Sequence, residues 1–228
     1  MSTRVGLIVP SSNTVMEVDL YRRLPESATL HTARMHLRET TPEGESAMLD
    51  EHLPTAIYDL ATAKPDVVVF GCTSAGALRG NEYEGELVKS IAEQTGAEAI
   101  SVAASVRRAI SARGAHRVGV ITPYVEALNT PIRASLEDVG IEVVGIHGLG
   151  IDENFAIASV EPSSIVAQAV EQFGSVEIDL LFASCTNFRA LDARDEIERE
   201  LGVPVLTSNQ AALEAIGDRL AVLTEGSG

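Results

Sequence analysis

The sequence predicts an α/β protein of two similar lobes, each built on a parallel sheet of about four strands. Three observations indicate this fold. Short apolar runs alternate with amphipathic stretches along the whole 228-residue chain, the second half repeats motifs of the first, and no segment rich in Pro, Gly or Ser separates the halves. Strand–helix alternation of this length is typical of parallel sheets with helices on both faces.

Eight short runs rich in apolar and β-branched residues are the expected strands. They are Val5–Val9, Thr29–Arg34, Val67–Phe70, Ala99–Val102, Val118–Thr122, Glu142–His147, Asp179–Ala183 and Val203–Leu206. Five stretches between them have the apolar spacing of amphipathic helices: Glu45–Ala63, Gly85–Thr95, Tyr124–Val139, Ser163–Phe173 and Ala190–Leu201. Each strand–helix–strand crossover is expected to be right-handed.

The internal repeat gives the domain organisation. Arg4-Val5-Gly6, Pro10, Asp66 and Cys72-Thr73 recur 113 residues later as Arg117-Val118-Gly119, Pro123, Asp179 and Cys185-Thr186. Beyond the cysteines the offset falls to 106, so that Gly96 matches Gly202 and Ile110 matches Ile216. We therefore expect two flavodoxin-like lobes, residues 1–112 and 113–228, that face each other across a cleft holding the active site. The last helix is a candidate to pack back on the first lobe.

Composition excludes several classes of function. The net charge of −16 argues against nucleic-acid binding, because no basic stripe is present to neutralise phosphates. No apolar run approaches the roughly 20 residues of a membrane span, and the N-terminus lacks the pattern of a secretory signal. A chain of this size does not need its two cysteines as a disulfide. We expect a cytoplasmic protein with reduced thiols and no membrane partner, and we expect it to form a homo-oligomer.

The two cysteines are the strongest candidates for chemistry. Ligands of open parallel sheets bind beyond the carboxyl ends of the strands. Cys72 and Cys185 each follow an expected strand at equivalent places in the two lobes, and each is followed by threonine. A single cysteine after an apolar strand is usually a small buried filler. A pair at symmetry-equivalent strand ends instead predicts two thiols that face one substrate from opposite sides.

Polar residues beside these strand ends are candidates for substrate binding. Ser11, Ser12 and Asn13 follow the first expected strand, and Tyr124 follows its counterpart in the second lobe. Asn13 is equally well explained as a helix cap, and Tyr124 as a buried residue between the lobes. Thr73, Ser74, Thr186 and Asn187 follow the cysteines and are expected to offer N–H groups at helix starts. Helix N-termini attract anions and lower the pKa of thiols.

Other motifs give no sign of a metal or cofactor. The five histidines lack the spacing of metal ligands, and no phosphate-binding loop is present. Acidic pairs such as Glu43 and Glu45 are expected to be solvated or to lie at helix starts. We therefore expect no metal site and no nucleotide or other cofactor.

Four segments together resemble the maleate cis-trans isomerases of the aspartate/glutamate racemase superfamily, near the arylmalonate decarboxylases. They are Arg-Val-Gly-Leu-Ile-Val-Pro-Ser-Ser-Asn-Thr at 4–14, Gly-Cys-Thr-Ser at 71–74, Thr-Pro-Tyr at 122–124 and Ser-Cys-Thr-Asn-Phe-Arg-Ala at 184–190. Arylmalonate decarboxylases keep only the second cysteine, so Cys72 favours the isomerases. After the first motif, Ala75-Gly76-Ala77 stands where a Ser-Gly pair is common. That departure bears on substrate fit more than on chemistry.

The resemblance implies a cofactor-independent isomerase of small dicarboxylates that converts maleate to fumarate. Cys72 would be the nucleophile, Cys185 the partnering acid or base, and Asn13 and Tyr124 the residues that hold the substrate carboxylates. Two alternatives stay open at this point. An amino-acid racemase of the aspartate, glutamate or hydantoin type would use the same thiols as acid and base. A non-catalytic diacid-binding protein would share the two lobes but leaves the paired cysteines unexplained.

Overall fold

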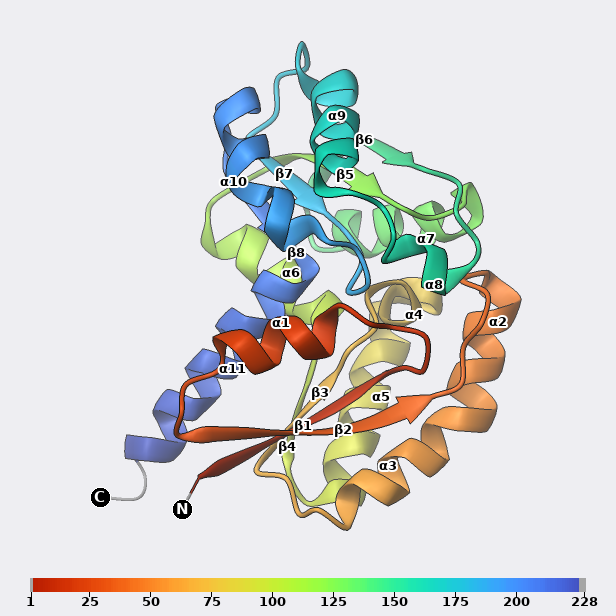
Figure 1. Ribbon diagram of the computed structural model, residues 1–228, viewed down its shortest axis with the longest axis vertical. Coiled ribbons are helices and arrows are strands. Elements are labelled where there is room, and N and C mark those ends of the chain that lie inside the picture. The colour runs from red at the N-terminus through yellow and green to blue at the C-terminus, as the bar shows by residue number, and fades with distance from the viewer. Residues whose placement is uncertain (1, 226–228) are drawn as a thin grey trace.

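The computed structural model describes residues 2–225 and consists of two four-stranded parallel sheets with helices packed around them (Figure 1). The first sheet has the order β2-β1-β3-β4, and the second has the matching order β6-β5-β7-β8. The strands of the first sheet are β1 (Thr3–Pro10), β2 (Ala28–Met35), β3 (Val67–Phe70) and β4 (Glu98–Ser101). Those of the second sheet are β5 (Arg117–Thr122), β6 (Glu142–Gly148), β7 (Leu180–Ala183) and β8 (Val205–Thr207). All eight expected strands and the α/β class are confirmed.

The central strands are the most apolar, as parallel sheets covered on both faces require. Every residue of β3 and β7 is buried, whereas the edge strands β2 and β6 keep partly exposed residues along much of their length. The backbone N–H and C=O groups of the other two central strands, β1 and β5, pair on both sides, since each of these strands lies between two neighbours. The carboxyl ends of both sheets are therefore held in fixed positions.

The sequence repeat corresponds to repeated local structure. At the start of β1 the backbone N–H of Arg4 donates to Asp66 (2.7 Å), and at the start of β5 the N–H of Arg117 donates to Asp179 (2.8 Å). The pKa of Asp66 is lowered by hydrogen bonds from the Arg4 guanidinium and from this N–H, and the pKa of Asp179 by the N–H groups of Arg117 and His116. The helices after β3 and β7 end at Gly96 and Gly202, each left-handed with φ of 68°. Glycine suits both positions because other residues rarely adopt this conformation.

The helices of the first half are α1 (Met16–Arg23), α2 (Pro42–Ala47), the π-helical turn η1 (Met48–His52), α3 (Leu53–Ala61), α4 (Thr73–Leu78), α5 (Gly80–Thr95) and α6 (Val102–Ala112). Those of the second half are α7 (Glu126–Glu137), α8 (Asn154–Ile157), α9 (Pro162–Phe173), α10 (Ala190–Leu201) and α11 (Ser208–Glu225). The expected helix over 45–63 is thus three pieces. The sequence analysis gave no bounds for α1, α4, α6, α8 or α11, although it expected helix starts near Asn13 and Thr73 and a last helix on the first lobe.

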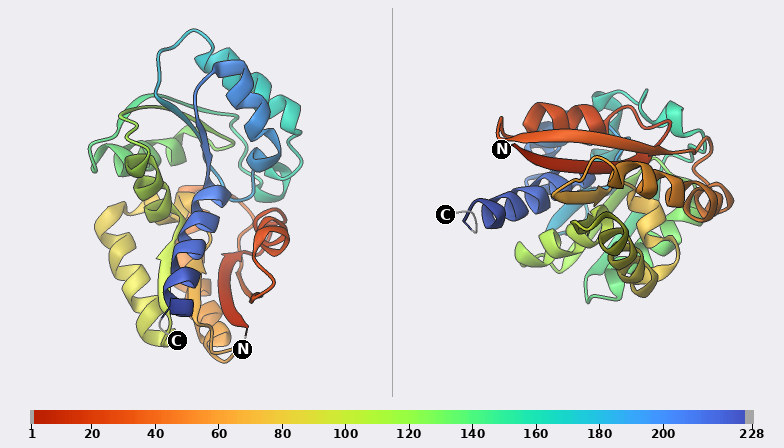
Figure 2. Two further views of the ribbon diagram at one scale, coloured as in Figure 1. Left: turned by 90° about the vertical axis from the view of Figure 1, so that its left-hand side faces the viewer. Right: turned by 90° about the horizontal axis from the view of Figure 1, so that it is seen from below.

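Helices from both halves pack together at the junction of the two sheets. The equivalent helices α6 and α11 contact each other, and α4 contacts α7. Near its start, Asn209 of α11 donates to Asp19 of α1 (2.8 Å). From the junction α11 then runs along the first half toward the N-terminus (Figures 1 and 2). The last helix therefore packs on the first lobe. The lobe limits at 112 and 113 stay a prediction, and their outer ends, residue 1 and residues 226–228, lie outside the described residues.

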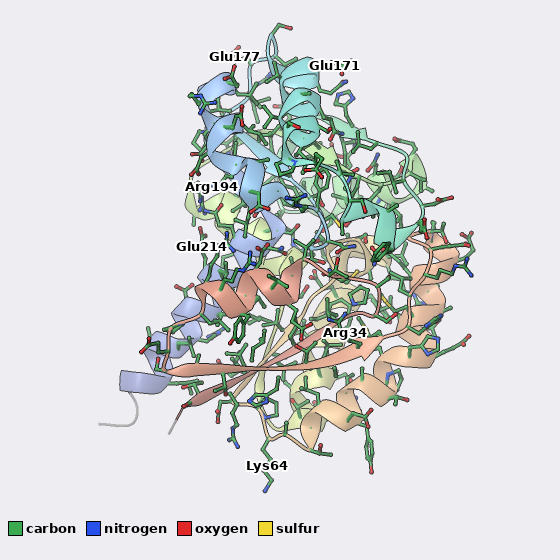
Figure 3. All side chains as sticks on the ribbon, in the orientation of Figure 1. Arg34, Lys64, Glu171, Glu177, Arg194 and Glu214 are labelled. Atoms are coloured by element: carbon green, nitrogen blue, oxygen red, sulfur yellow. The ribbon has the colours of Figure 1, made fainter. Side chains whose placement is uncertain are left out.

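Charged side chains lie on the outside of both halves. Lys64 projects from the end of the first half farthest from the junction, and Glu171 and Glu177 lie at the far end of the second (Figure 3). None of the helices within residues 2–225 is long and apolar enough to cross a lipid bilayer.

Candidate active site

Cys72 stands between the end of β3 and the start of α4, beneath the junction. Gly71 precedes it, and a Cβ at this position would lie 2.9 Å from Leu7 and Met16 side-chain atoms and 3.0 Å from the carbonyl oxygen of Ile8. Only glycine lets the chain pass so close to β1 before it turns into the helix. The Cys72 side chain is buried, and its sulfur lies 3.8 Å from the hydroxyl of Ser74.

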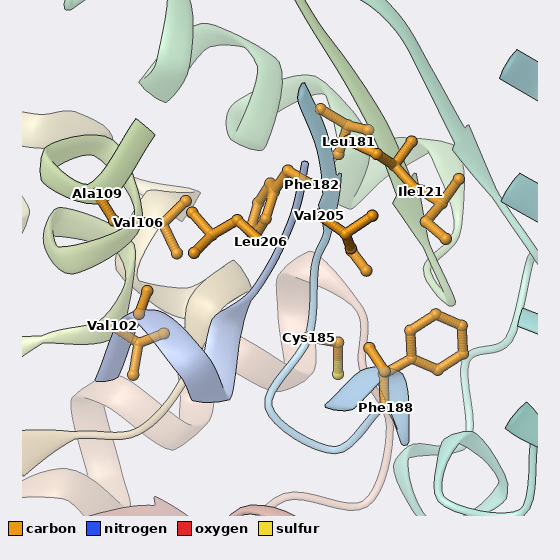
Figure 4. Close-up of a cluster of buried hydrophobic side chains, with 14 of the residues drawn as sticks. Val102, Val106, Ala109, Ile121, Leu181, Phe182, Cys185, Phe188, Val205 and Leu206 are labelled. Atoms are coloured by element: carbon orange, nitrogen blue, oxygen red, sulfur yellow. The ribbon is translucent and has the colours of Figure 1, made fainter. Parts of the chain in front are cut away.

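Cys185 occupies the equivalent place after β7, beside Phe188 and beyond the core side chains of Phe182 and Val205 (Figure 4). Its φ is +120°, a conformation that costs non-glycine residues on the order of 1–3 kcal/mol and is concentrated at functional sites. The backbone N–H of Cys185 donates to the hydroxyl of Ser208 (3.0 Å), which also accepts a hydrogen bond from Thr73 (2.9 Å). Ser208, a residue that the sequence analysis missed, thus joins the two cysteine loops.

The two thiols are free, buried and close enough to influence each other. Burial raises the pKa of Cys72 well above its usual value, and Glu45 and Cys185 raise it further. Burial also raises the pKa of Cys185 to about 12, although the hydrogen bonds from Tyr124 and from the N–H of Asn187 lower it. The expected lowering of the thiol pKa by helix N-termini is therefore wrong in direction, because desolvation outweighs the N–H groups.

Tyr124 is a buried residue between the halves and also a neighbour of the thiols. Its side chain is 2% exposed, and its hydroxyl donates to the sulfur of Cys185. Burial raises the pKa of Tyr124 well above its usual value, followed by the effects of Cys185 and Cys72. The phenol is therefore a neutral donor to the sulfur of Cys185.

Asn13 has the first of the two roles that the sequence left open, that of a helix cap. Its Oδ1 accepts the backbone N–H groups of Val15 and Met16, both at 3.0 Å, at the start of α1. Its Nδ2 donates across the junction to the hydroxyl of Thr186 (3.0 Å), which in turn donates to the carbonyl of Gly71 (3.1 Å). The residue is a helix cap that also connects the two cysteine loops. Its second N–H remains as a candidate donor to a ligand.

The other predicted residues support these loops. The Oδ1 of Asn187 accepts the N–H of Thr14 (2.9 Å), and the backbone N–H of Asn187 donates to the sulfur of Cys185 (3.2 Å). The hydroxyl of Ser12 donates to the carbonyl of Leu37 (2.6 Å), and the hydroxyl of Ser11 accepts the N–H of the same residue (3.1 Å). Thr73 and Ser74 do begin a helix, α4. Thr186 and Asn187 lie in a turn before α10, so the expectation of a helix start there is wrong.

A pair of loops closes over this site. The N–H of Thr40 donates to the carbonyl of Asp152 (2.6 Å), and Glu39 and Glu153 form an antiparallel bridge. Asn154, another residue the sequence analysis missed, donates to Ser12 (2.7 Å) and accepts from Thr40 and Asn187. Asn154 thus joins these loops to the turn after Cys185, and the side chains of Cys72 and Cys185 are buried, with 5% and 4% exposed.

Glu45 departs in part from the sequence analysis. It lies in the first turn of α2, as one of the two expectations had it, but its side chain is 0% exposed and not solvated, while Glu43 is exposed. Ser74 donates a short hydrogen bond to Glu45 Oε1. Burial raises the pKa of Glu45 to about 8, and the hydrogen bond from Ser74 opposes this rise. Nothing in the local pattern of α2 distinguishes Glu45 from the exposed glutamate two residues earlier.

Replacement of Asn13 by alanine tests its two roles. Asn13→Ala should lower the free energy of unfolding by about 1 kcal/mol through the lost cap. It should also lower kcat/KM at least about tenfold if the amide donates to a charged substrate. Ser101→Ala is the matched control, because Ser101 caps α6 away from the thiols. Thermal melts and initial rates measure both effects. A loss of stability with unchanged kcat/KM would leave Asn13 as a cap alone.

Comparison with known proteins now connects this geometry to a family. A model of the arylmalonate decarboxylase family matches residues 5–225. The chain belongs to the arylmalonate decarboxylase family. Among its relatives, a maleate isomerase of Nocardia farcinica is 29% identical over 223 residues, which cover 93% of this chain and 88% of the relative.

Solved structures of the family also superpose closely. A cysteine-to-alanine mutant of the maleate isomerase of Pseudomonas putida S16, solved with maleate, has a TM-score of 0.89 and 26% identity over 97% of this chain and 93% of its own. A cysteine-to-serine mutant of the Nocardia farcinica maleate cis-trans isomerase has a TM-score of 0.89 and 28% identity over 97% and 94%. That mutant carries a covalently bound succinylcysteine intermediate.

Proposed function

We propose that this protein converts maleate to fumarate through a covalent adduct on Cys72, without an added cofactor. The observation that carries the proposal is the pair of free, buried thiols at equivalent strand ends, joined through Ser208, Thr186 and Asn13. The succinylcysteine in the Nocardia farcinica relative supports covalent chemistry at a cysteine of this fold.

The reaction needs the π bond of maleate to be broken for a time. The Cys72 sulfur adds to one alkene carbon, and the π electrons move into the adjacent carboxylate as an enediolate. The former double bond is then single and rotates. The electron pair returns, the carbon–sulfur bond breaks, and the trans alkene leaves. Cys185 is proposed to stabilise or protonate the carbanion from the opposite face.

Neutral donors must bind the two carboxylates, because the neighbours of the thiols are uncharged or acidic. The first-turn N–H groups of α4, the helix that begins directly after Cys72, have no acceptor within their own helix and are proposed donors. Tyr124, the second N–H of Asn13, and the turn of Thr186 and Asn187 complete the proposed donors. Hydrogen bonds to the developing enediolate in an enclosed site are stronger than in water.

Maleate turnover by the purified protein is the direct test. Incubation with maleate alone, followed by proton NMR, should show conversion to fumarate without metal, pyridoxal phosphate or nucleotide. Parallel samples with aspartate or glutamate in deuterated water should show no deuterium at Cα, and phenylmalonate should not be decarboxylated. Fast Cα exchange with inert maleate would place the protein among the racemases. Loss of phenylmalonate would indicate a decarboxylase.

Reduced thiols are a condition of this mechanism, so we propose that the enzyme works in the cytoplasm, where thiols stay reduced. The expected homo-oligomer and the absence of nucleic-acid and membrane partners stay predictions.

A further inference from the structure

Glu45 is a buried carboxyl group near the thiols. The proposed isomerisation mechanism assigns it no role. The side chain is 0% exposed, and Oε1 accepts the hydrogen bond from Ser74. Within the described part of the chain, Oε2 is buried without a hydrogen-bond partner. A buried carboxylate oxygen in this state is costly, whereas a protonated carboxyl group is tolerated.

Ser74 connects this carboxyl group to the nucleophile. Its hydroxyl lies 3.8 Å from the sulfur of Cys72 and donates to Glu45 Oε1. Because a hydroxyl group both donates and accepts, it can receive a proton from sulfur while passing its own to the carboxylate. The three side chains come from two segments, the end of β3 with α4 and the separate helix α2, which contact each other.

The thiol of Cys72 needs such an acceptor. It must lose its proton before the sulfur attacks, yet its pKa lies well above the usual value because of burial. The side chain of Cys72 is only 5% exposed, so few routes lead its proton directly to bulk water. Glu45 is the better acceptor among the buried neighbours, because its pKa of about 8 lies below that of Cys185, about 12, and below that of Tyr124, which burial raises well above its usual value.

We infer that Glu45 accepts the proton of Cys72 through the Ser74 hydroxyl when the thiol attacks, and returns it when the product leaves. This inference rests on the proposed function. Because Glu45 acts through Ser74 and does not touch the substrate, it is a positioning residue for the thiol proton.

The step balances without any other reactant. On attack the sulfur–hydrogen bond breaks, the proton moves to Ser74 Oγ, and the Ser74 proton moves to Glu45 Oε1. At the same time the carbon–sulfur bond forms and the π pair enters the enediolate. On elimination the pair re-forms the double bond, the carbon–sulfur bond breaks, and the protons return by the same path.

The groups around Glu45 determine the pH at which it works. Ser74 faces it from α4, and the titratable groups that it affects are Cys72 after β3, Tyr124 after β5 and Cys185 after β7. With a pKa of about 8, Glu45 gives up its proton before Cys72 does. The pair then shares the remaining proton, and the observed pKa belongs to both groups. Thiolate formation at Cys72 should therefore rise with pH and level off near pH 8.

Alkylation of Cys72 tests this without any substrate. The rate of labelling by iodoacetamide, followed by mass spectrometry of the peptide that contains Cys72, should level off near pH 8 in the unaltered protein. In Glu45→Gln it should keep rising about tenfold per pH unit through this range, because only the thiol's own pKa remains. An identical levelling in both proteins, or none in the unaltered protein, would overturn the role of Glu45.

Kinetics and stability complete the test. With maleate above pH 8, where Glu45 is ionised in the unaltered protein, Glu45→Gln should lower kcat about 100-fold with little change in KM, as expected for loss of an internal proton acceptor. Glu84→Gln is the matched control: Glu84 is also a buried glutamate bonded to a serine, but it pairs with Arg107 on α6. It should lower the melting temperature and leave the bend near pH 8 in place.

The melting temperature of Glu45→Gln should rise above pH 8, whereas that of the control Glu84→Gln should fall. The folded protein holds the Glu45 proton more tightly than the unfolded chain, so stability falls as pH rises from about 4.5 through about 8. Glu45→Gln removes this loss and should melt higher than the unaltered protein above pH 8, with no difference below pH 4.5. A lower melting temperature at pH 8 together with an unchanged labelling profile would assign Glu45 a purely structural role.

Failure of the unaltered protein to convert maleate would reject the proposed function but leave the labelling result valid.

Discussion

Cys72→Ser should abolish the conversion of maleate to fumarate, lowering kcat by about 10⁴-fold or more, as removal of a covalent nucleophile does. A serine hydroxyl is far less acidic and less polarisable than a thiol, and Glu45 with a pKa of about 8 is too weak a base to activate it. Initial rates by proton NMR measure the loss.

Binding of the diacid should survive this change, because Cys72 is not among the proposed carboxylate donors. Titration calorimetry with maleate should give an affinity within a few-fold of the unaltered protein, and the melting temperature should show that the fold is intact. Turnover within about tenfold of normal would contradict covalent catalysis at Cys72.

Cys185→Ser is expected to have the second-largest effect, a loss of about 10²–10⁴-fold in kcat, the range typical of a missing acid or base. Its sulfur accepts hydrogen bonds from Tyr124 and from the N–H of Asn187, which hold the thiol in place. Serine should preserve these contacts and the positive φ of the loop. Cys185→Ala is the companion variant, which removes the proton donor and acceptor altogether.

The two variants should differ in what accumulates. If Cys185 acts after the attack of Cys72, the adduct forms in Cys185→Ser but is released slowly, so single-turnover experiments should show a fast first phase and a slow second one. A loss of the first phase, with no adduct, would instead assign Cys185 a part in the attack itself.

The sequence predicted the fold well because its signals are local and repeated. Strands such as β3 and β7 are continuous apolar runs, and the pairs of Asp66 with Asp179 and of Gly96 with Gly202 mark the same turns in both halves. Helix α4 was expected only as a helix start at Thr73 and Ser74, since its six residues are too few for a periodic pattern. Helix α11 was expected only as a last helix without bounds, since its apolar periodicity is weak and it contacts both halves.

The site was predictable only in part. Both cysteines were found because the repeat places them at equivalent strand ends, and Asn13 and Tyr124 because they follow the first strand of each half. Glu45 and Ser208 reach the thiols through tertiary packing, from segments far away in the chain. The pKa of the thiols could not be predicted either, since it depends on burial, which opposes the local N–H groups.

The most direct test of covalent catalysis is the site of an adduct. Cys185→Ser protein incubated with maleate, quenched in acid and digested, should yield a succinylated peptide that contains Cys72, and the peptide that contains residue 185 should be unmodified. The same treatment of Cys72→Ser should give no succinylated peptide. Succinylation at Cys185 in Cys72→Ser, with none at Cys72 in Cys185→Ser, would contradict the assignment of Cys72 as the nucleophile.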